Sequence, residues 1–534
     1  MSAFVLAGAG AALLLGFLLY AVKNRRNSKL PPSPPPLPLV GHLHLIGRLP
    51  HRSLHELHLR YGGGGGGLLH LQLGRRRTLV VSTAAAAADL FRNHDLAFSS
   101  RPHNAAAHKQ TYGSRNISFS PYGDHWRRAK KIAVVHLLSQ RHVEAFEAVR
   151  QAEAAALVAR TRRAAEAGEA VVLKELLYGY TNSVVTRAAA GTAGTTAERL
   201  RQLMAHSATL VAGFQADDVL PDAAARVFRR ATGLEKKIDD MNGEWDRFLS
   251  EIIAEHKEKK ARPGQAGGDF LDVLLQLRED EGHHEGFVLS DDGIKAIAKD
   301  MIAAATDTTA VTLEWAMAEL VGNPRVMGKL QEEIARVVSG INTTTEELTT
   351  IIAETDLNRM AYLRAVVKEV FRLHPPVPLL LPRESMAAAA VQGGRYEVPA
   401  KTALLVNAWA IGRDPAAWDA PEEFRPERFL LPAQAAAVDL KGTDYQLLPF
   451  GTGRRICPGI NFALPVLELA LASLLRHFDW ELPGGMRPED LDMVEAPGLS
   501  TPPRAPLVLL PKWKTLACTA VCAQGIETIV LEQI

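Results

Sequence analysis

The chain has 534 residues, 47% of them hydrophobic and 22% charged, a balance that fits a large folded protein and excludes a disordered one. Its net charge is +2, from 61 basic and 59 acidic residues, so no global attraction to nucleic acid is expected. The three cysteines, Cys457, Cys518 and Cys522, exclude a disulfide framework, and we expect the folded body in a reducing compartment.

The first predicted element is a membrane anchor at residues 1–22. Ala3–Val22 is apolar apart from the ring of Tyr20, and its 20 residues suffice to cross a bilayer as a helix. Four basic residues follow within 23–29, whereas a cleaved signal peptide carries its basic residues before the apolar run. This charge placement predicts an uncleaved, single-pass signal anchor with the rest of the chain in the cytosol.

Residues 23–50 are interpreted as a basic and proline-rich hinge. Leu30–Gly41 holds six prolines, which favour a stiff, extended chain. The same composition suits a ligand for an aromatic groove. Between an anchor and a folded body, however, the segment is predicted to be a spacer above the membrane.

Residues 51–514 are predicted to form a mostly helical body with a small β-rich part. The first elements expected there are helices at His51–Tyr61, Thr83–Asn93 and Asp124–Leu138, and strands at Leu68–Leu73 and Thr78–Ser82. The helix at Asp124–Leu138 is strongly basic, and by itself that pattern indicates a solvated face. No repeat of 20–50 residues appears, so we expect one body rather than an array.

Ser290–Asn323 predicts a long helix, with Ser290 as N-cap and Pro324 as the stop. About thirty helical residues span roughly 45 Å. Asp307 and three threonines interrupt its apolar middle. Taken alone, they indicate back-bonded threonines and a surface aspartate.

Another helix is expected at Asp356–Leu373, carrying Glu369 and Arg372. This E-x-x-R spacing is weak evidence alone, because Glu422 and Arg425 share it and ordinary surface pairs do too. Two further strands are expected downstream, around Tyr396–Val398 and Leu404–Asn407.

The loop Pro449–Gly459 holds Cys457 just before a hydrophobic, helix-like run, Ile460–Leu475. Basic neighbours and a helix N-terminus both lower a cysteine pKa, and a thiolate there can bind a metal, including haem iron. Glycines at 451, 453 and 459 are expected to allow sharp turns and a close approach to a flat cofactor. A bare buried cysteine is more often inert.

Phe450, Gly453, Arg455, Cys457 and Gly459 match the F-x-x-G-x-R-x-C-x-G loop of cytochromes P450 at the right spacing. Together with the predicted anchor, the proline-rich segment and the Asp307–Thr308 pair, this loop makes residues 1 to about 514 resemble a plant-type microsomal (class II) cytochrome P450 of the specialised-metabolism group. The resemblance implies a mainly α fold, a helical prism with a small β region. It also implies haem b with the Cys457 thiolate as its axial metal ligand, and O2 as co-substrate.

The resemblance assigns roles to other positions. Asp307 and Thr308 would deliver protons beside the bound oxygen, with Ala305 replacing the usual glycine. Trp126, Lys130 and Arg383 would contact the haem propionates, although the family pattern has arginine at the position of Lys130. Further implied sets are the cofactor loop residues Phe450, Gly453, Arg455 and Gly459, the structural cluster Glu369–Arg372–Arg428, and the substrate-pocket positions Ala304, Val377, Leu381 and Leu499.

The implied function is oxidation of a small, mostly apolar or phenolic metabolite, with electrons from NADPH through NADPH:cytochrome P450 reductase. Cytochrome b5 is a further candidate partner, no nucleic acid is expected, and the location would be the endoplasmic reticulum membrane facing the cytosol. Three alternatives stay open: a reductase-independent isomerase or dehydratase, a haem carrier or sensor, and a paralogue with impaired turnover. Residues 515–534 have no predicted role.

Overall fold

The structure is a computed structural model. It describes residues 29–63, 66–191, 198–200, 202–204, 220, 222–260, 268–281, 289–339, 352–432 and 436–514. The predicted anchor at 1–22 and the tail at 515–534, with Cys518 and Cys522, lie outside the described residues.

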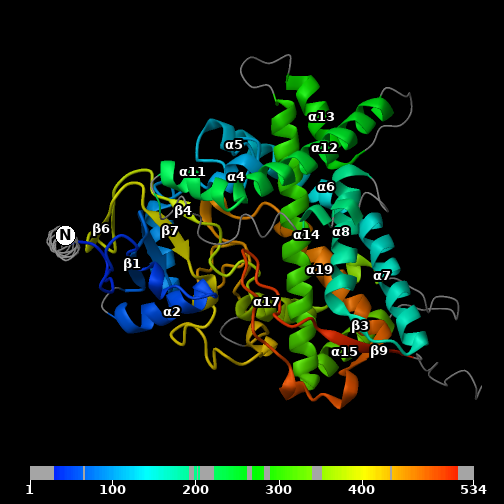
Figure 1. Ribbon diagram of the computed structural model, residues 1–534. Helices are drawn as coiled ribbons and strands as arrows, with labels where there is room; N and C mark the ends of the chain where they lie inside the picture. Colours follow the sequence, from blue (N-terminus) through cyan, green and yellow to red (C-terminus); the bar gives the residue numbers. More distant parts are fainter. Residues whose placement is uncertain are drawn as a thin grey trace, which may run out of the picture.

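Helices build most of the described body (Figure 1). They are α2 (Pro50–Tyr61), α3 (Ala84–His94), α4 (Ala105–Gln110), α5 (Asp124–Lys131), α6 (Gln140–Ala145), α7 (Glu147–Ala167), α8 (Leu173–Ala190), α11 (Asp222–Ala231), α12 (Leu234–Lys260), α13 (Phe270–Glu281), α14 (Asp291–Gly322), α15 (Pro324–Ser339), α16 (Glu354–Leu357), α17 (Ala361–Leu373), α18 (Ala408–Ile411) and α19 (Ile460–His477).

The strands form small sheets at the edges of the body. They are β1 (Leu68–Leu73), β2 (Arg76–Val81), β3 (Val171–Val172), β4 (Arg383–Glu384), β5 (Ala389–Val391), β6 (Tyr396–Val398), β7 (Ala403–Val406), β8 (Phe478–Glu481) and β9 (Val508–Trp513). Within the described chain, the sheet orders are β1-β2-β7-β4, β3-β9-β8 and β5-β6. β2 pairs in parallel with β7, which joins chain segments more than 300 residues apart.

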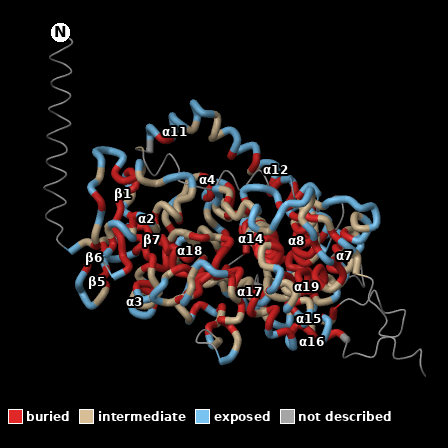
Figure 2. Tube along the Cα trace, turned by 90° about the horizontal axis from the view of Figure 1, so that it is seen from below, coloured by how far each residue is buried: buried red, intermediate tan, exposed pale blue. Residues whose placement is uncertain are grey.

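The long helix α14 runs through the centre of the body, as its sequence predicts (Figure 1). Ser290 caps it by accepting a hydrogen bond from the Gly293 N–H at 3.1 Å, and α15 begins at Pro324 after the helix ends. Helices α8, α17 and α19 pack around α14, and their facing sides form the largest buried core (Figure 2). A straight, buried helix of this length gives a fixed frame on which a site can be placed.

Two predicted helices are interrupted. The one expected at Asp124–Leu138 ends as α5 at Lys131 and continues as a π-helical turn, in which the Leu138 N–H bonds the Ala133 carbonyl. The one expected at Asp356–Leu373 splits into α16 and α17. Its second part begins at 361 because the Glu333 carboxylate of α15 accepts from the N–H groups at the start of α17.

The proline-rich hinge is not a free spacer over its described part. The Pro32 carbonyl accepts from the His70 N–H at 2.8 Å, and the His42 N–H donates to the Gln72 carbonyl at 2.7 Å. Residues 32–42 therefore lie along β1. The free edge of β1 offers these backbone partners, which composition does not reveal.

Among the described residues, α19 is the one helix long and apolar enough to cross a membrane. It is 61% buried inside the body, which identifies it as a core helix.

Candidate functional site

The cysteine loop is shaped by its own backbone. Gly451 and Gly453 have φ of +71° and +61°, a region that side chains disfavour, so both positions need glycine. The Cys457 N–H donates to the Phe450 carbonyl at 2.9 Å, which closes the loop. Gly459 differs from expectation: its φ is −88°, and an added Cβ would lie 3.6 Å from the Cys457 sulfur, an ordinary contact. No turn there requires glycine.

The Cys457 sulfur is half-buried directly before α19. Its Sγ accepts from the Gly459 N–H at 3.3 Å. Burial raises the pKa of the Cys457 thiol, while this hydrogen bond and the nearby Lys130 ammonium oppose the rise. A bound cation at Sγ would favour the thiolate outright, so the donor chemistry suits a metal ligand.

Asp95, just past the end of α3, holds the loop from outside. It accepts hydrogen bonds from Arg383 at 3.2 Å and from the Arg454 guanidinium at 2.8 Å, and an added Cβ on Gly453 would lie 2.2 Å from its Oδ1. Sequence reasoning missed Asp95. A usable signal existed, since an acidic residue is unfavourable at the negative end of a helix unless a cation pairs with it.

Cationic side chains gather beside this loop from four separate segments. Among the described residues, Arg101, Lys130, Arg383 and Arg455 repel one another across the space next to Cys457. Burial lowers the pKa of all four, and repulsion from the neighbouring guanidinium groups adds to it at Arg101, Lys130 and Arg455: the pKa of Lys130 falls to about 8 and that of Arg455 to about 9.

The charges in this cluster are not balanced by the described carboxylates that face it. Asp95 pairs with Arg383, while burial raises the pKa of Asp300, which favours its neutral form. A group of buried cations with too few anions suits a ligand with acidic side chains. Haem carries two propionates and an iron that a thiolate can ligate, so these cations and Cys457 fit haem.

Two of the residues expected to contact the propionates, Arg383 and Lys130, bond the cysteine loop, and a further cation joins them. Arg383 donates to the Thr452 carbonyl at 2.5 Å, and Lys130 donates to the Ile456 carbonyl beside the cysteine. Trp126 donates its Nε1–H to the Ile117 carbonyl at 3.2 Å. Arg101 is the addition, and its donors reach the carbonyls of Ser118, Leu381 and Pro382 at 2.6–2.8 Å.

The middle of α14 holds the predicted acid and alcohol. Thr308 bonds back to the Ala304 carbonyl at 2.7 Å, as its sequence alone indicates. Asp307 is not a surface aspartate: it accepts hydrogen bonds from the Tyr178 hydroxyl of α8 and from the Ser500 hydroxyl. Burial raises the pKa of its carboxyl group. Tyr178 and Ser500 were missed, since nothing local in the sequence links them to residue 307.

The expected substrate-pocket positions lie on α14 and on two loops, one of which contacts this acid through Ser500. Ala304 is exposed one turn before Thr308, and Val377, Leu381 and Leu499 are half-buried. The Thr501 N–H donates to the Pro376 carbonyl at 3.1 Å, and Trp315 of α14 donates to the Thr501 carbonyl at 2.8 Å. The two loops that carry the apolar positions are thus tied to each other and to α14.

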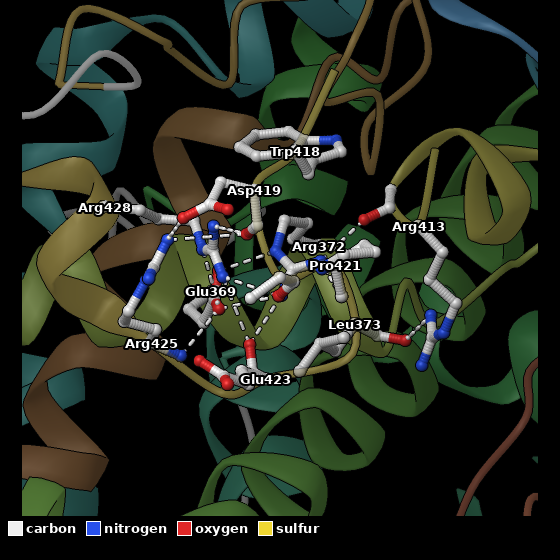
Figure 3. Close-up of polar contacts among 12 residues, drawn as sticks. Glu369, Arg372, Leu373, Arg413, Trp418, Asp419, Pro421, Glu423, Arg425 and Arg428 are labelled. Carbon is white, nitrogen blue, oxygen red and sulfur yellow. Dashed lines mark hydrogen bonds and ion pairs between the residues drawn. The ribbon is translucent and has the colours of Figure 1, made fainter. Parts of the chain in front are cut away.

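The predicted charge cluster forms between α17 and the segment at 412–428 (Figure 3). Glu369 accepts from Arg372 at 2.7 and 2.8 Å and from Arg428 at 3.0 Å. Both guanidinium groups also donate to backbone carbonyls of residues 412–423, so the buried charges are hydrogen-bonded throughout. The other E-x-x-R pattern, at Glu422 and Arg425, does not form an ion pair with itself: Arg425 pairs with Asp419, and Glu422 pairs with Arg413.

Comparison with known proteins gives a consistent result. The family model for cytochrome P450 matches residues 31–510. The chain is 41% identical to Cytochrome P450 71A2 of Solanum melongena, covering 93% of this chain and 95% of that one. It is 41% identical to salviol synthase of Salvia pomifera (92% and 93% covered) and 40% identical to premnaspirodiene oxygenase of Hyoscyamus muticus (93% and 96% covered).

A solved structure shares the architecture. A zebrafish cytochrome P450 determined with progesterone has a TM-score of 0.71 at 24% identity, covering 87% of this chain and 99% of that one. At this identity the likeness bears on the fold alone, and it confirms the mainly helical fold predicted from the sequence.

Proposed function

This chain belongs to the cytochrome P450 family and is an oxidoreductase of its monooxygenase class, and from this premise we propose that it binds haem through Cys457 and oxidises a small, mostly apolar or phenolic specialised metabolite. The observation that carries the proposal is the buried, uncompensated cation cluster around the Cys457 loop. Relatives named as salviol synthase and premnaspirodiene oxygenase support the substrate class.

Each group of residues has a separate task. Arg101, Lys130, Arg383 and Arg455 would hold the propionates, and the Glu369 cluster would fix the loop from behind. When bound, haem supplies the activation of O2, and the thiolate ligand favours O–O cleavage. Asp307 holds a proton near Thr308, and the apolar loops around Val377 and Leu499 exclude water from the substrate.

The electron donor we propose is NADPH:cytochrome P450 reductase, with cytochrome b5 as a second donor. Arg127, Arg128 and Lys131 lie exposed on α5, while Lys130 of the same helix bonds the Ile456 carbonyl. The basic face of α5 is therefore attached directly to the cysteine loop, which suits docking of an acidic partner close to the cofactor. We place the protein in the endoplasmic reticulum membrane through residues 1–22.

A carbon monoxide difference spectrum of reduced microsomes tests the site. Wild type should show the Soret band of a thiolate-ligated haem, and Cys457→Ser should lose it. The matched control Cys518→Ser should keep it. A haem-replete wild type without this band would overturn the assignment of Cys457.

Turnover tests the activity. Microsomes with reductase are incubated with a panel that includes premnaspirodiene, and the products are followed by mass spectrometry with and without NADPH. The proposal expects products carrying one added oxygen atom that require NADPH. Products of unchanged oxygen content formed without NADPH would instead support the isomerase or dehydratase alternative.

A further inference from the structure

Protons must reach the buried centre of this enzyme. Each monooxygenation takes up two electrons and two protons, places one oxygen atom of O2 in the product and releases the other as water. Asp307 is held by Tyr178 and Ser500, so after each proton it gives away it must be protonated again from somewhere.

The contact between α8 and α14 offers a route by which protons can reach Asp307 from solvent. The two helices pack along each other beside the loop at 500–507 (Figure 1). Tyr178 of α8 meets Asp307 of α14, and Lys174 lies one turn before Tyr178, exposed to solvent. Glu314 lies two turns after Asp307 on the same face of α14.

Glu314 is unusual within the described part of the chain. It is 1% exposed, and no side chain hydrogen-bonds either of its carboxylate oxygens; only the backbone of Leu507 approaches them. A buried carboxyl group with so little hydrogen bonding costs stability, so its presence calls for an explanation. Burial raises its pKa to about 7, and Lys174, whose charge also acts on Asp307, opposes the rise.

We propose that the contact between α8 and α14 conducts protons from solvent at Lys174, through Glu314 and the Tyr178 hydroxyl, to Asp307. Tyr178 passes its hydroxyl proton to the Asp307 carboxylate and receives another from the Glu314 side through water. Glu314 regains its proton from solvent beside Lys174. No bond other than O–H forms or breaks, and no oxidant is needed.

The first test follows the protonation of Glu314 and does not depend on turnover. Infrared spectra of the purified protein at pH 6 should show the carbonyl stretch of a protonated carboxyl group that Glu314→Gln removes. This band should shift within seconds in D2O. Glu468→Gln is the matched control, because burial also raises the pKa of Glu468 to about 7 but on α19. A Glu314 band that is absent, or that exchanges only over hours, overturns the proposal.

The second test compares two oxidants, with a substrate from the panel above. Glu314→Gln and Tyr178→Phe should lower the product formed per NADPH about three- to tenfold, the difference appearing as hydrogen peroxide. Cumene hydroperoxide brings its own proton and should support wild-type rates in both variants. Tyr180 lies on the same helix as Tyr178, but its hydroxyl donates to the Val466 carbonyl of α19. Tyr180→Phe should therefore leave the product formed per NADPH unchanged.

The inference rests on the proposed monooxygenase function, but the two fail differently. Equal losses with NADPH and with peroxide would mean structural damage, and unchanged yields in both variants would exclude a relay; either result overturns the inference while leaving the function intact. A wild type with no NADPH-dependent products would contradict the function, and the infrared band would still decide whether Glu314 exchanges protons with solvent.

Discussion

At the scale of single residues, Lys130 departs most visibly from the family pattern. Its ammonium group is buried among three guanidinium groups, which is why its pKa falls to about 8. Bound propionates would favour the charged form and raise this pKa again. On haem binding Lys130 therefore takes up a proton above pH 8, while the Cys457 thiol releases one, so only the contribution of Lys130 to haem affinity should fall as the pH rises from 8 toward 10.

Haem transfer to apomyoglobin at pH 7, 8, 9 and 10 measures this effect. Relative to Lys130→Arg, whose charge stays fixed in this range, wild type should lose affinity by up to about tenfold per pH unit, because the Cys457 contribution is common to both proteins. The exposed neighbour Lys131→Arg should behave as wild type, and identical slopes for all three proteins would refute the argument.

Glu369 is the second residue-scale case, because two guanidinium groups depend on it. In Glu369→Gln both Arg372 and Arg428 lose their counter-charge inside the core, which should lower the unfolding free energy by about 3–5 kcal/mol. Denaturant unfolding of the purified protein measures the loss. Glu422→Gln removes the exposed partner of Arg413 and should cost under about 1 kcal/mol. Comparable losses would show that burial does not set the cost.

At the scale of elements, the start of α17 depends on a side chain from another helix. The Glu333 carboxylate of α15 accepts from the N–H groups of Tyr362 and Leu363 at 2.8 and 2.9 Å, so it caps α17 from outside. Glu333→Ala should therefore lower the unfolding free energy by about 1–2 kcal/mol, whereas the exposed neighbour Glu332→Ala should change it little. If Glu332→Ala costs as much, the cap is not what sets the start of α17.

This cap also shows where sequence-based prediction stops. The residue bounds of strand β6 and of helix α14 were predicted closely. Signals within each segment mark them, such as Ser290 and Pro324 at the two ends of α14. The break before α17 was missed, because its cause lies about 30 residues away. The same limit applies to the residues of the site. A local motif identified Cys457 as a candidate, whereas Asp95, Arg101 and Tyr178 could not be identified from sequence, because they act through contacts that only the folded chain creates.

At the scale of the whole molecule, exposed apolar side chains gather at one end of the body. Leu39 is 86% exposed, and the Val40 carbonyl beside it accepts from Gly74 at the β1–β2 turn. Arg75 of that turn bonds the Leu220 carbonyl just before α11, where Val227 and Phe228 are 66% and 48% exposed. Exposed apolar groups next to basic side chains suit a membrane surface, so this end is expected to face the bilayer.

Removing residues 1–28 tests how the anchor and this surface share membrane attachment. The truncated protein should keep the Cys457-dependent carbon monoxide band, since the described body begins beyond the deletion, and it should still float with phosphatidylcholine–phosphatidylserine vesicles in low salt. Adding Leu39→Ser and Phe228→Ser should lower that flotation several-fold, because burying each of these side chains is worth about 1.5–3 kcal/mol. Leu431→Ser is the matched control, since Leu431 is exposed on a separate loop. Undiminished flotation of the double variant would place the membrane contact on another face of the molecule.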